Sequence, residues 1–298
     1  MSLVTDDVPV HEYLIEGRQV YVVRDDLCCP FPGNNNSKSR GVYNYIKNLD
    51  NDVIGVIDSK VSRAGWGVAW LASKLGKKVY LYIDKGYIDH FFRLMAKLHG
   101  AVIVPFTVKR IRIGYYMAKK DVESKGGVML PLYLKLLNTV SEVYRLASNV
   151  LPKYDARTVV ISVGSGTIAS GIVRAADKCV VYGICHSDAS LVERYRTIEL
   201  FSGKRKGIEL IRMGYTYGEP NYNVVPPFPS DLYYDRWAWQ WLVENVGRLK
   251  DPIIFWNVGG EWHHETGMHP MFRGDGVTSR EEVVRWVEGR RLIQQIPT

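Results

Sequence analysis

The chain has 298 residues, 46% of them apolar and 23% charged, and it carries a formal net charge of +8. This length and composition suit one large or two modest domains with buried cores, and they exclude a disordered or fibrous chain. No apolar run approaches the roughly 18–20 residues of a membrane span, and the first residues lack a signal peptide. We therefore expect a cytoplasmic protein without a membrane partner.

The excess of Lys and Arg favours an anionic partner, such as a phosphorylated cofactor, an acidic metabolite or a nucleic acid. Charge alone does not choose among these. The cysteines have neither the paired spacing of a metal site nor that of a disulfide framework. We expect them to be small buried side chains; they are Cys28, Cys29, Cys179 and Cys185.

Short apolar strands alternate with amphipathic helices along most of the chain. The patterns predict strands at 20–24, 53–57, 79–83, 101–106, 128–132, 158–163, 179–185, 208–213 and 253–258. They predict helices at 39–49, 65–75, 88–99, 110–124, 134–150, 167–176 and 191–201, one from about Asp231 and one from Ser279. Such alternation indicates an α/β fold of parallel β-α-β units, with helices on both faces of the sheet.

The turn after the first predicted strand ends in a single lysine. Residues 30–41 read Pro-Phe-Pro-Gly-Asn-Asn-Asn-Ser-Lys-Ser-Arg-Gly, which places Lys38 at the start of a helix. A lysine amine can form a Schiff base with a carbonyl group when desolvation or a positive neighbour makes it nucleophilic. Arg40 could supply that charge. The alternative is an ordinary solvated lysine.

A second turn, Gly164-Ser165-Gly166-Thr167, joins the strand at 158–163 to the next helix. It directs backbone N–H groups, two hydroxyls and a helix N-terminus to one spot, an arrangement that binds phosphate. The motif is neither a Walker loop nor a complete dinucleotide fingerprint. A plain tight turn is the alternative.

Two later segments follow the lysine turn and the glycine-rich turn along the chain. Residues 229–238 read Pro-Ser-Asp-Leu-Tyr-Tyr-Asp-Arg-Trp-Ala, and residues 253–260 read Ile-Ile-Phe-Trp-Asn-Val-Gly-Gly. With residues 24–41 and the glycine-rich turn, they resemble fold-type II pyridoxal-phosphate (PLP) enzymes, notably the aminocyclopropane-carboxylate deaminase and D-cysteine desulfhydrase branch. The resemblance implies a homodimer of chains with two three-layer α/β lobes and mostly parallel sheets. A small lobe of residues 42–144 would be inserted between residues 1–41 and 145–298 of the large cofactor-binding lobe.

The resemblance also implies roles for individual residues. Lys38 would bind pyridoxal 5'-phosphate covalently and move the proton at the substrate α-carbon, and residues 164–167 would hold the phosphate. Asp235 would face the pyridine nitrogen, where a carboxylate keeps the nitrogen protonated and makes the ring a stronger electron sink. Tyr234 would lie against the cofactor as a catalytic residue. An ordinary helix first turn with a capping acid is the alternative for these last two residues.

The loop after the strand at 53–57 departs from the family pattern. Relatives have an asparagine there, often after a serine, whereas residues 58–67 contain no asparagine. Ser62 could take the catalytic serine's place and Arg63 the asparagine's, where a guanidinium could bind a substrate carboxylate bidentately. Asn257 stands where relatives have histidine, and we expect it to contact substrate. These departures favour a different substrate or reaction.

The leading interpretation is a PLP-dependent deaminase or lyase that acts at the α-carbon of an amino acid or a similar small substrate. The basic charge and eight tryptophans favour an alternative, a decarboxylase or lyase for an amino-acid group on a larger anionic molecule, such as a modified DNA base. A third interpretation is a non-catalytic binding protein with this fold. No metal site is expected, because the spacing of His263, His264, Glu265 and His269 is irregular.

Overall fold

The computed structural model describes residues 3–5, 7–30, 37–59, 62–87, 91–107, 110–204 and 207–260. Most of the turn before Lys38, the histidines after residue 260 and the helix expected from Ser279 lie outside these residues. In chain order the elements are β1 Val10–Ile15, β2 Arg18–Arg24, η1 Asp25–Leu27, α1 Lys38–Lys47, β3 Val53–Ile57, α2 Ala64–Lys74, β4 Lys78–Asp84, η2 Lys85–Tyr87, α3 Phe91–Leu98, β5 Val102–Phe106, α4 Ile111–Ser124, β6 Val128–Met129, η3 Leu132–Leu134, α5 Leu137–Lys153, β7 Thr158–Ser162, α6 Thr167–Ala175, β8 Val180–Cys185, α7 Leu191–Ser202, β9 Ile208–Arg212, α8 Asp235–Asn245, η4 Val246–Arg248 and β10 Ile253–Asn257.

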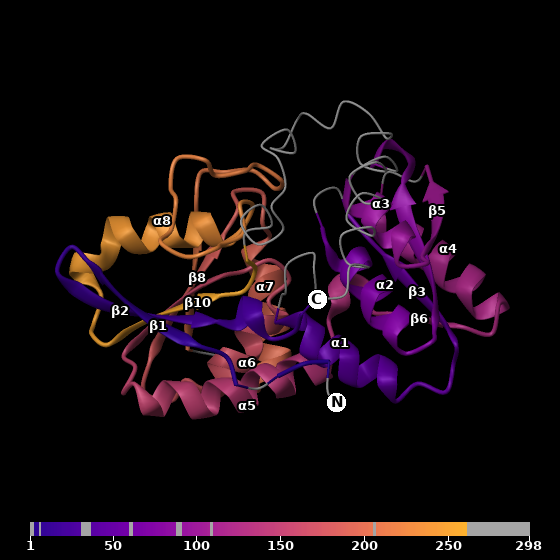
Figure 1. The fold of residues 1–298 in the computed structure, drawn as a ribbon. Helices are drawn as coiled ribbons and strands as arrows, with labels where there is room; N and C mark the ends of the chain where they lie inside the picture. Colours follow the sequence, from indigo (N-terminus) through magenta and orange to yellow (C-terminus); the bar gives the residue numbers. More distant parts are fainter. Residues whose placement is uncertain are drawn as a thin grey trace, which may run out of the picture.

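A six-stranded sheet organises the large lobe, in the order β1-β2-β10-β7-β8-β9. All neighbours pair in parallel except β1 and β2, which form an antiparallel hairpin at one edge. The central strands β7 and β10 are buried along their whole length. Helix α8 covers one face of the sheet, and α5 and α6 cover the other (Figure 1).

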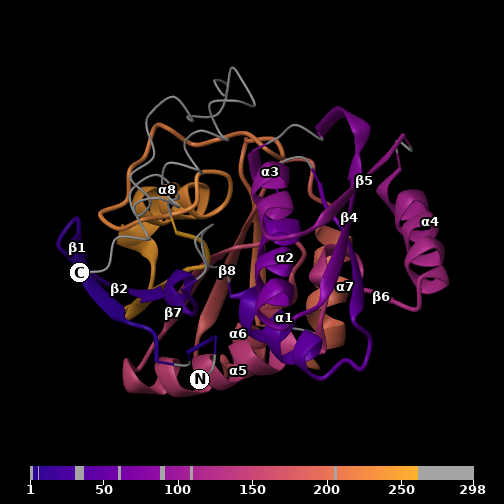
Figure 2. The ribbon, with the colours of Figure 1, turned by 45° about the vertical axis from the view of Figure 1, so that its right-hand side comes forward.

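A four-stranded parallel sheet, in the order β5-β4-β3-β6, organises the small lobe. Helices α2 and α3 lie on one face of it and α4 lies on the other, at the outer edge of the molecule (Figure 2). Both lobes therefore have three layers with mostly parallel sheets, which confirms the predicted fold class. Parallel sheets covered on both faces explain why their strands are continuously apolar.

The division into residues 42–144 and the remainder stays a proposal. The strands of the small sheet all fall between residues 53 and 129, but a boundary between residues 144 and 145 would cut helix α5 in its middle. Within the described residues, no helix combines the length and apolar character that a membrane crossing requires.

Candidate active site

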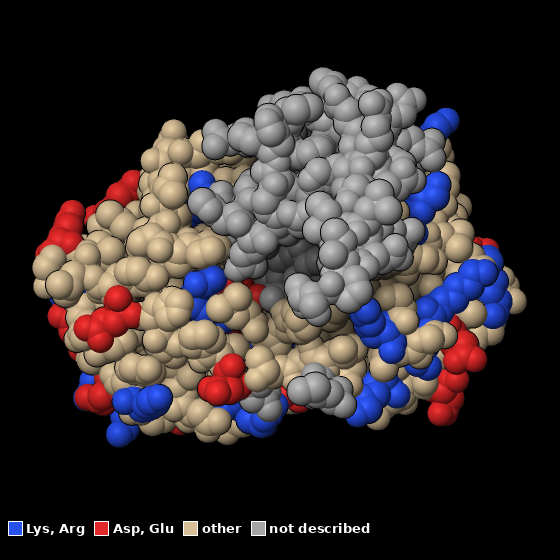
Figure 3. Space-filling view, viewed as in Figure 1, with Lys and Arg blue, Asp and Glu red and all other residues tan. Residues whose placement is uncertain are grey.

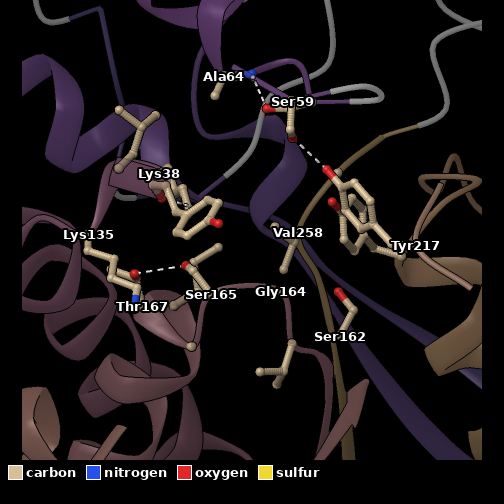
Figure 4. A pocket seen from close by; sticks show the side chains of 18 of the residues that line it. Lys38, Ser59, Ala64, Lys135, Ser162, Gly164, Ser165, Thr167, Tyr217 and Val258 are labelled. Atoms are coloured by element: carbon tan, nitrogen blue, oxygen red, sulfur yellow. Dashed lines mark hydrogen bonds between the residues drawn. The ribbon is translucent and has the colours of Figure 1, made fainter. Parts of the chain in front are cut away.

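A cavity of about 480 Å³ lies between the two lobes, where β3 and β7 end (Figure 4). Open parallel sheets bind ligands at this carboxyl edge. The wall includes residues that follow β3, β7, β8 and β10, the first residues of α1, α4, α6, α7 and α8, and the turn before α5. All the site residues predicted from the sequence line this cavity, except Asn257.

Lys38, the first residue of α1, enters the cavity and donates a hydrogen bond from Nζ to the Tyr133 carbonyl oxygen (2.8 Å). Burial and the nearby Lys135 lower its pKa to about 8, so about a tenth of the amine is neutral and nucleophilic at pH 7. We expected Arg40 to be the activating charge. Arg40 instead forms a buried ion pair with Asp25 (2.7 Å), which fixes the start of α1 to the large lobe.

The loop Gly164–Thr167 connects β7 to α6 at the cavity wall. Gly166 has a φ of +90°, a left-handed conformation that glycine adopts without strain. The first N–H groups of a helix have no partner within it. Beside them lie the Ser165 and Thr167 hydroxyls, whose oxygens are 3.0 Å apart (Figure 4). The loop thus presents neutral donors and a helix N-terminus to an anion.

Asp235 lies buried at the start of α8, with its carboxyl group in the cavity wall. Its Oδ2 accepts hydrogen bonds from the backbone N–H groups of Val258 (3.2 Å) and Gly259 (2.7 Å), and Ser162 Oγ donates to its Oδ1. Burial and the neighbouring Asp231 raise its pKa to about 8. The carboxyl group is therefore largely protonated at pH 7 and can share that proton with a basic ring nitrogen.

Two tyrosines and a serine, Tyr217, Tyr234 and Ser59, also line the cavity. Burial and the adjacent Tyr217 raise the pKa of Tyr234 well above its usual value, so the Tyr234 hydroxyl keeps its proton at neutral pH. The Tyr217 hydroxyl lies 2.7 Å from Ser59 Oγ, a hydrogen bond that joins the large lobe to the small lobe (Figure 4). A Cβ atom at Gly164 would lie 3.7 Å from the Tyr234 ring, so this ring lies beside the Gly164–Thr167 loop.

The loop after β3 holds the two serines differently. Ser62 Oγ accepts a hydrogen bond from the Ala64 N–H (3.1 Å) and so caps the start of α2. Ser59 Oγ faces Tyr217 across the cavity instead. Arg93 donates to the carbonyl oxygens of both serines, which holds the two ends of the loop in place. Both serines line the cavity, and the catalytic role predicted for Ser62 stays a prediction.

Arg63 already has an ionic partner in the cavity wall. Its Nη2 lies 2.5 Å from Asp231 Oδ2, and both side chains are largely buried. Its guanidinium also lies 5.2 Å from the centre of the Phe92 ring. The ion pair joins the two lobes, and a substrate carboxylate would meet a guanidinium whose charge is partly neutralised.

Asn257 does not line the cavity, and its side-chain nitrogen binds protein groups. It is fully buried at the end of β10. Its Nδ2 donates to Asp26 Oδ1 (2.9 Å) and to the Pro229 carbonyl oxygen (3.0 Å). These contacts support the loop before α8, and the predicted contact of Asn257 with substrate stays a prediction.

The cavity fits pyridoxal phosphate in size and in the chemistry of its walls. An amine at Lys38, neutral anion donors at residues 164–167 and a buried carboxyl group at Asp235 match the aldehyde, phosphate and pyridine nitrogen of that cofactor. The volume is within the usual range for small-molecule sites. No group of potential metal ligands occurs in the part of the chain that the structure describes.

The comparison with known proteins agrees with this fit. No family model matches the chain. The glycyl-dTMP PLP-dependent decarboxylase of Pseudomonas phage M6 is 33% identical over 278 residues, which are 86% of this chain and all of that protein. The chain belongs to the PLP-dependent enzymes of fold type II. The predicted cofactor and enzyme class are thereby confirmed.

Solved structures show the same fold at lower identity. An ACC deaminase homologue has a TM-score of 0.72 and 18% identity, with 87% of this enzyme and 91% of that chain covered. The processed form of threonine deaminase isoform 2 from Solanum lycopersicum has a TM-score of 0.64 and 15% identity, with 87% and 85% covered. The chain thus has nearly the full extent of these folds.

Several cavity residues were not predicted from the sequence. Ser59 could have been found, because it follows the end of β3 and the carboxyl edge of a parallel sheet carries the site. Tyr217 and Lys135 belong to no recognisable motif, and only the tertiary fold brings them to the cavity. Asp231 stands in the segment 229–238, but that resemblance gave it no role.

Proposed function

We propose that this enzyme removes the carboxylate of a glycyl-type amino-acid group attached to a thymine nucleotide, with pyridoxal phosphate bound at Lys38. The observation that carries the proposal is a cofactor-shaped cavity in a chain 33% identical to a glycyl-dTMP decarboxylase along that protein's whole length. When bound, the cofactor serves as an electron sink at the substrate α-carbon.

The residues of the chain divide the remaining tasks. The loop at residues 164–167 anchors the phosphate, and Asp235 holds a proton at the pyridine nitrogen. Lys38 would hold the cofactor covalently through its amine, and the same amine would supply the proton that the α-carbon gains when carbon dioxide leaves. Tyr217 and Ser59 exclude water on the side of the small lobe, where their hydrogen bond joins the lobes.

The state of Arg63 supports loss of the carboxylate over its retention. An unpaired guanidinium would stabilise a bound carboxylate, and so would oppose its departure as neutral carbon dioxide. Arg63 is instead paired with Asp231 at 2.5 Å, which weakens its attraction for the substrate. In this proposal Arg63 orients the carboxylate without holding it strongly.

A basic surface next to the cavity supports a large anionic substrate. Helix α4 begins at Ile111, which lines the cavity, and it exposes Tyr116. Five cations are also exposed along it, namely Arg110 just before the helix, Arg112, Lys119 and Lys120 within it, and Lys125 just after it. Lys and Arg side chains gather on this side of the molecule (Figure 3). Such a surface suits phosphates that extend from the cavity, including those of DNA that carries the modified base.

The test uses the holoenzyme and glycyl-dTMP labelled with carbon-13 at the carboxylate. We expect one equivalent of labelled carbon dioxide for each substrate consumed, and none with Lys38→Ala. Free labelled glycine is the control that shows whether the substrate must carry a nucleotide. Release of ammonia with the carboxylate retained would refute decarboxylation and support a deaminase.

Two further arms concern partners. If the substrate is a base within DNA, binding to modified DNA should weaken steeply as salt rises, because phosphate contacts release counterions. Binding that ignores salt would leave the free nucleotide as substrate. A homodimer and a cytoplasmic location remain predictions, and light scattering of the purified enzyme tests the first.

A further inference from the structure

Lys135 lies beside the Gly164–Thr167 loop, and apart from lowering the pKa of Lys38 it has no role in the function proposed above. Its Nζ donates a hydrogen bond to Thr197 Oγ1 (3.0 Å). Thr197 in turn packs against the loop, since its Cβ lies 3.6 Å from the position of a Cβ atom at Gly166. In Figure 4, Lys135 reaches the side of the cavity that holds Lys38, Ser165 and Thr167.

Among the described residues, the charged groups that act on Lys135 are two cations, Arg112 and Arg194, and one anion, Glu193. Burial lowers the pKa of Lys135, Glu193 raises it, and Arg194 and Arg112 lower it further. Glu193 is already paired with Arg112 at 2.5 Å. The hydrogen bond of Lys135 goes to a neutral hydroxyl, so its half-buried positive charge lacks an anionic partner among these residues.

An unusual turn places Lys135 in the cavity wall. The preceding residues, Tyr133 and Leu134, have φ values of +62° and +53°. The left-handed region is unfavourable for residues with a Cβ atom, and such strain persists where the surrounding structure imposes it, commonly at functional sites. Here the turn directs the Tyr133 carbonyl oxygen to Lys38 and places Lys135 near the Gly164–Thr167 loop.

We propose that Lys135 is a ligand of the cofactor phosphate and supplies the positive charge that the Gly164–Thr167 loop lacks. The loop offers neutral donors and a helix N-terminus, whereas the phosphate of pyridoxal phosphate is close to a dianion. An ammonium group at Thr197 stands at the edge of that loop and adds a charge-assisted hydrogen bond. The inference concerns the cofactor, so it goes beyond the proposed decarboxylation and survives if another substrate is found.

The experiment measures the affinity of the cofactor-free protein for pyridoxine 5'-phosphate and for pyridoxine by titration calorimetry. Neither compound has an aldehyde, so Lys38 cannot bind them covalently. Lys135→Ala should weaken binding of the phosphate ester by about 10- to 100-fold, as expected for a lost hydrogen bond between charged groups. Its affinity for pyridoxine should stay within about twofold, since the contact is with the phosphate.

Matched variants separate charge from structure. Lys135→Arg should keep most of the affinity, Lys135→Gln should lose as much as Lys135→Ala, and Lys178→Ala, at an exposed lysine in the turn before β8, should change nothing. Equal weakening for both ligands, or no weakening for the phosphate ester, would overturn the proposal. A third arm uses dTMP: if Lys135→Ala weakens dTMP alone, the lysine serves the substrate phosphate and the proposal is wrong.

Discussion

The carboxyl group of Asp235 should make the cofactor-free protein less stable as the pH rises. Burial and Asp231 raise its pKa from 3.8 to about 8. Between these values the folded protein keeps a proton that the unfolded chain has released, so the free energy of unfolding falls with increasing pH. At 1.36 kcal/mol per pH unit, the whole interval corresponds to about 6 kcal/mol at most.

Asp235→Asn should remove this dependence. An asparagine can accept the N–H groups of Val258 and Gly259 and can meet Ser162 with its amide. Urea unfolding at pH 5, 6, 7 and 8 should show the variant gaining at least about 2 kcal/mol relative to the wild type between the two extremes. Asp177→Asn is the control, because the exposed Asp177 has a lowered pKa and titrates below this range. Equal slopes for the wild type and Asp235→Asn would refute the reasoning.

Three further changes test other parts of the site. Gly166→Ala should destabilise the protein by about 1–2 kcal/mol in urea unfolding, because φ is +90° and a side chain lies 3.2 Å from the new Cβ atom. Gly164→Ala is the control and should cost much less, since its new Cβ atom has a contact at 3.7 Å. Equal losses of stability would contradict the described conformation of the loop. Arg63→Met should lower the free energy of unfolding by about 3 kcal/mol, because it leaves Asp231 buried without its ion-pair partner. Adding Asp231→Asn to this variant should recover part of the lost stability. If the losses of the two single variants simply add in the double variant, the two residues are not coupled. Nuclear magnetic resonance titration of methylated Lys38 should give a midpoint near 8, whereas a midpoint near 10.5 would show an ordinary solvated amine.

The sequence predicted most of the fold, because parallel strands buried on both faces are continuously apolar. The hairpin strand β1 was missed, because it is an edge strand in which two polar residues, His11 and Glu12, are followed by three apolar ones. Its sequence therefore lacks the regular alternation that signals a half-buried strand. Helix α8 begins at Asp235 rather than near Asp231. The Asp231 carboxylate accepts the N–H groups of Tyr233 and Tyr234 and holds a turn ahead of the helix.

The site was predictable where its residues belong to a local motif. Lys38 and residues 164–167 each stand at the start of a helix in a recognisable turn, and Asp235 stands in a segment resembling the family. Lys135 acts on Lys38 although the two are far apart in sequence. This electrostatic effect depends on how the turn at residues 133–135 packs against the large lobe, and no local sequence pattern predicts that packing.

The central claim is that this enzyme binds pyridoxal phosphate covalently at Lys38. Borohydride reduction of the holoenzyme, followed by digestion and mass spectrometry, locates the lysine that carries the cofactor. We predict one phosphopyridoxyl group per chain, on the peptide that contains Lys38, and none in a folded Lys38→Ala protein. Attachment to Lys135, the second amine in the cavity, or no attachment to the folded wild-type protein would contradict the account.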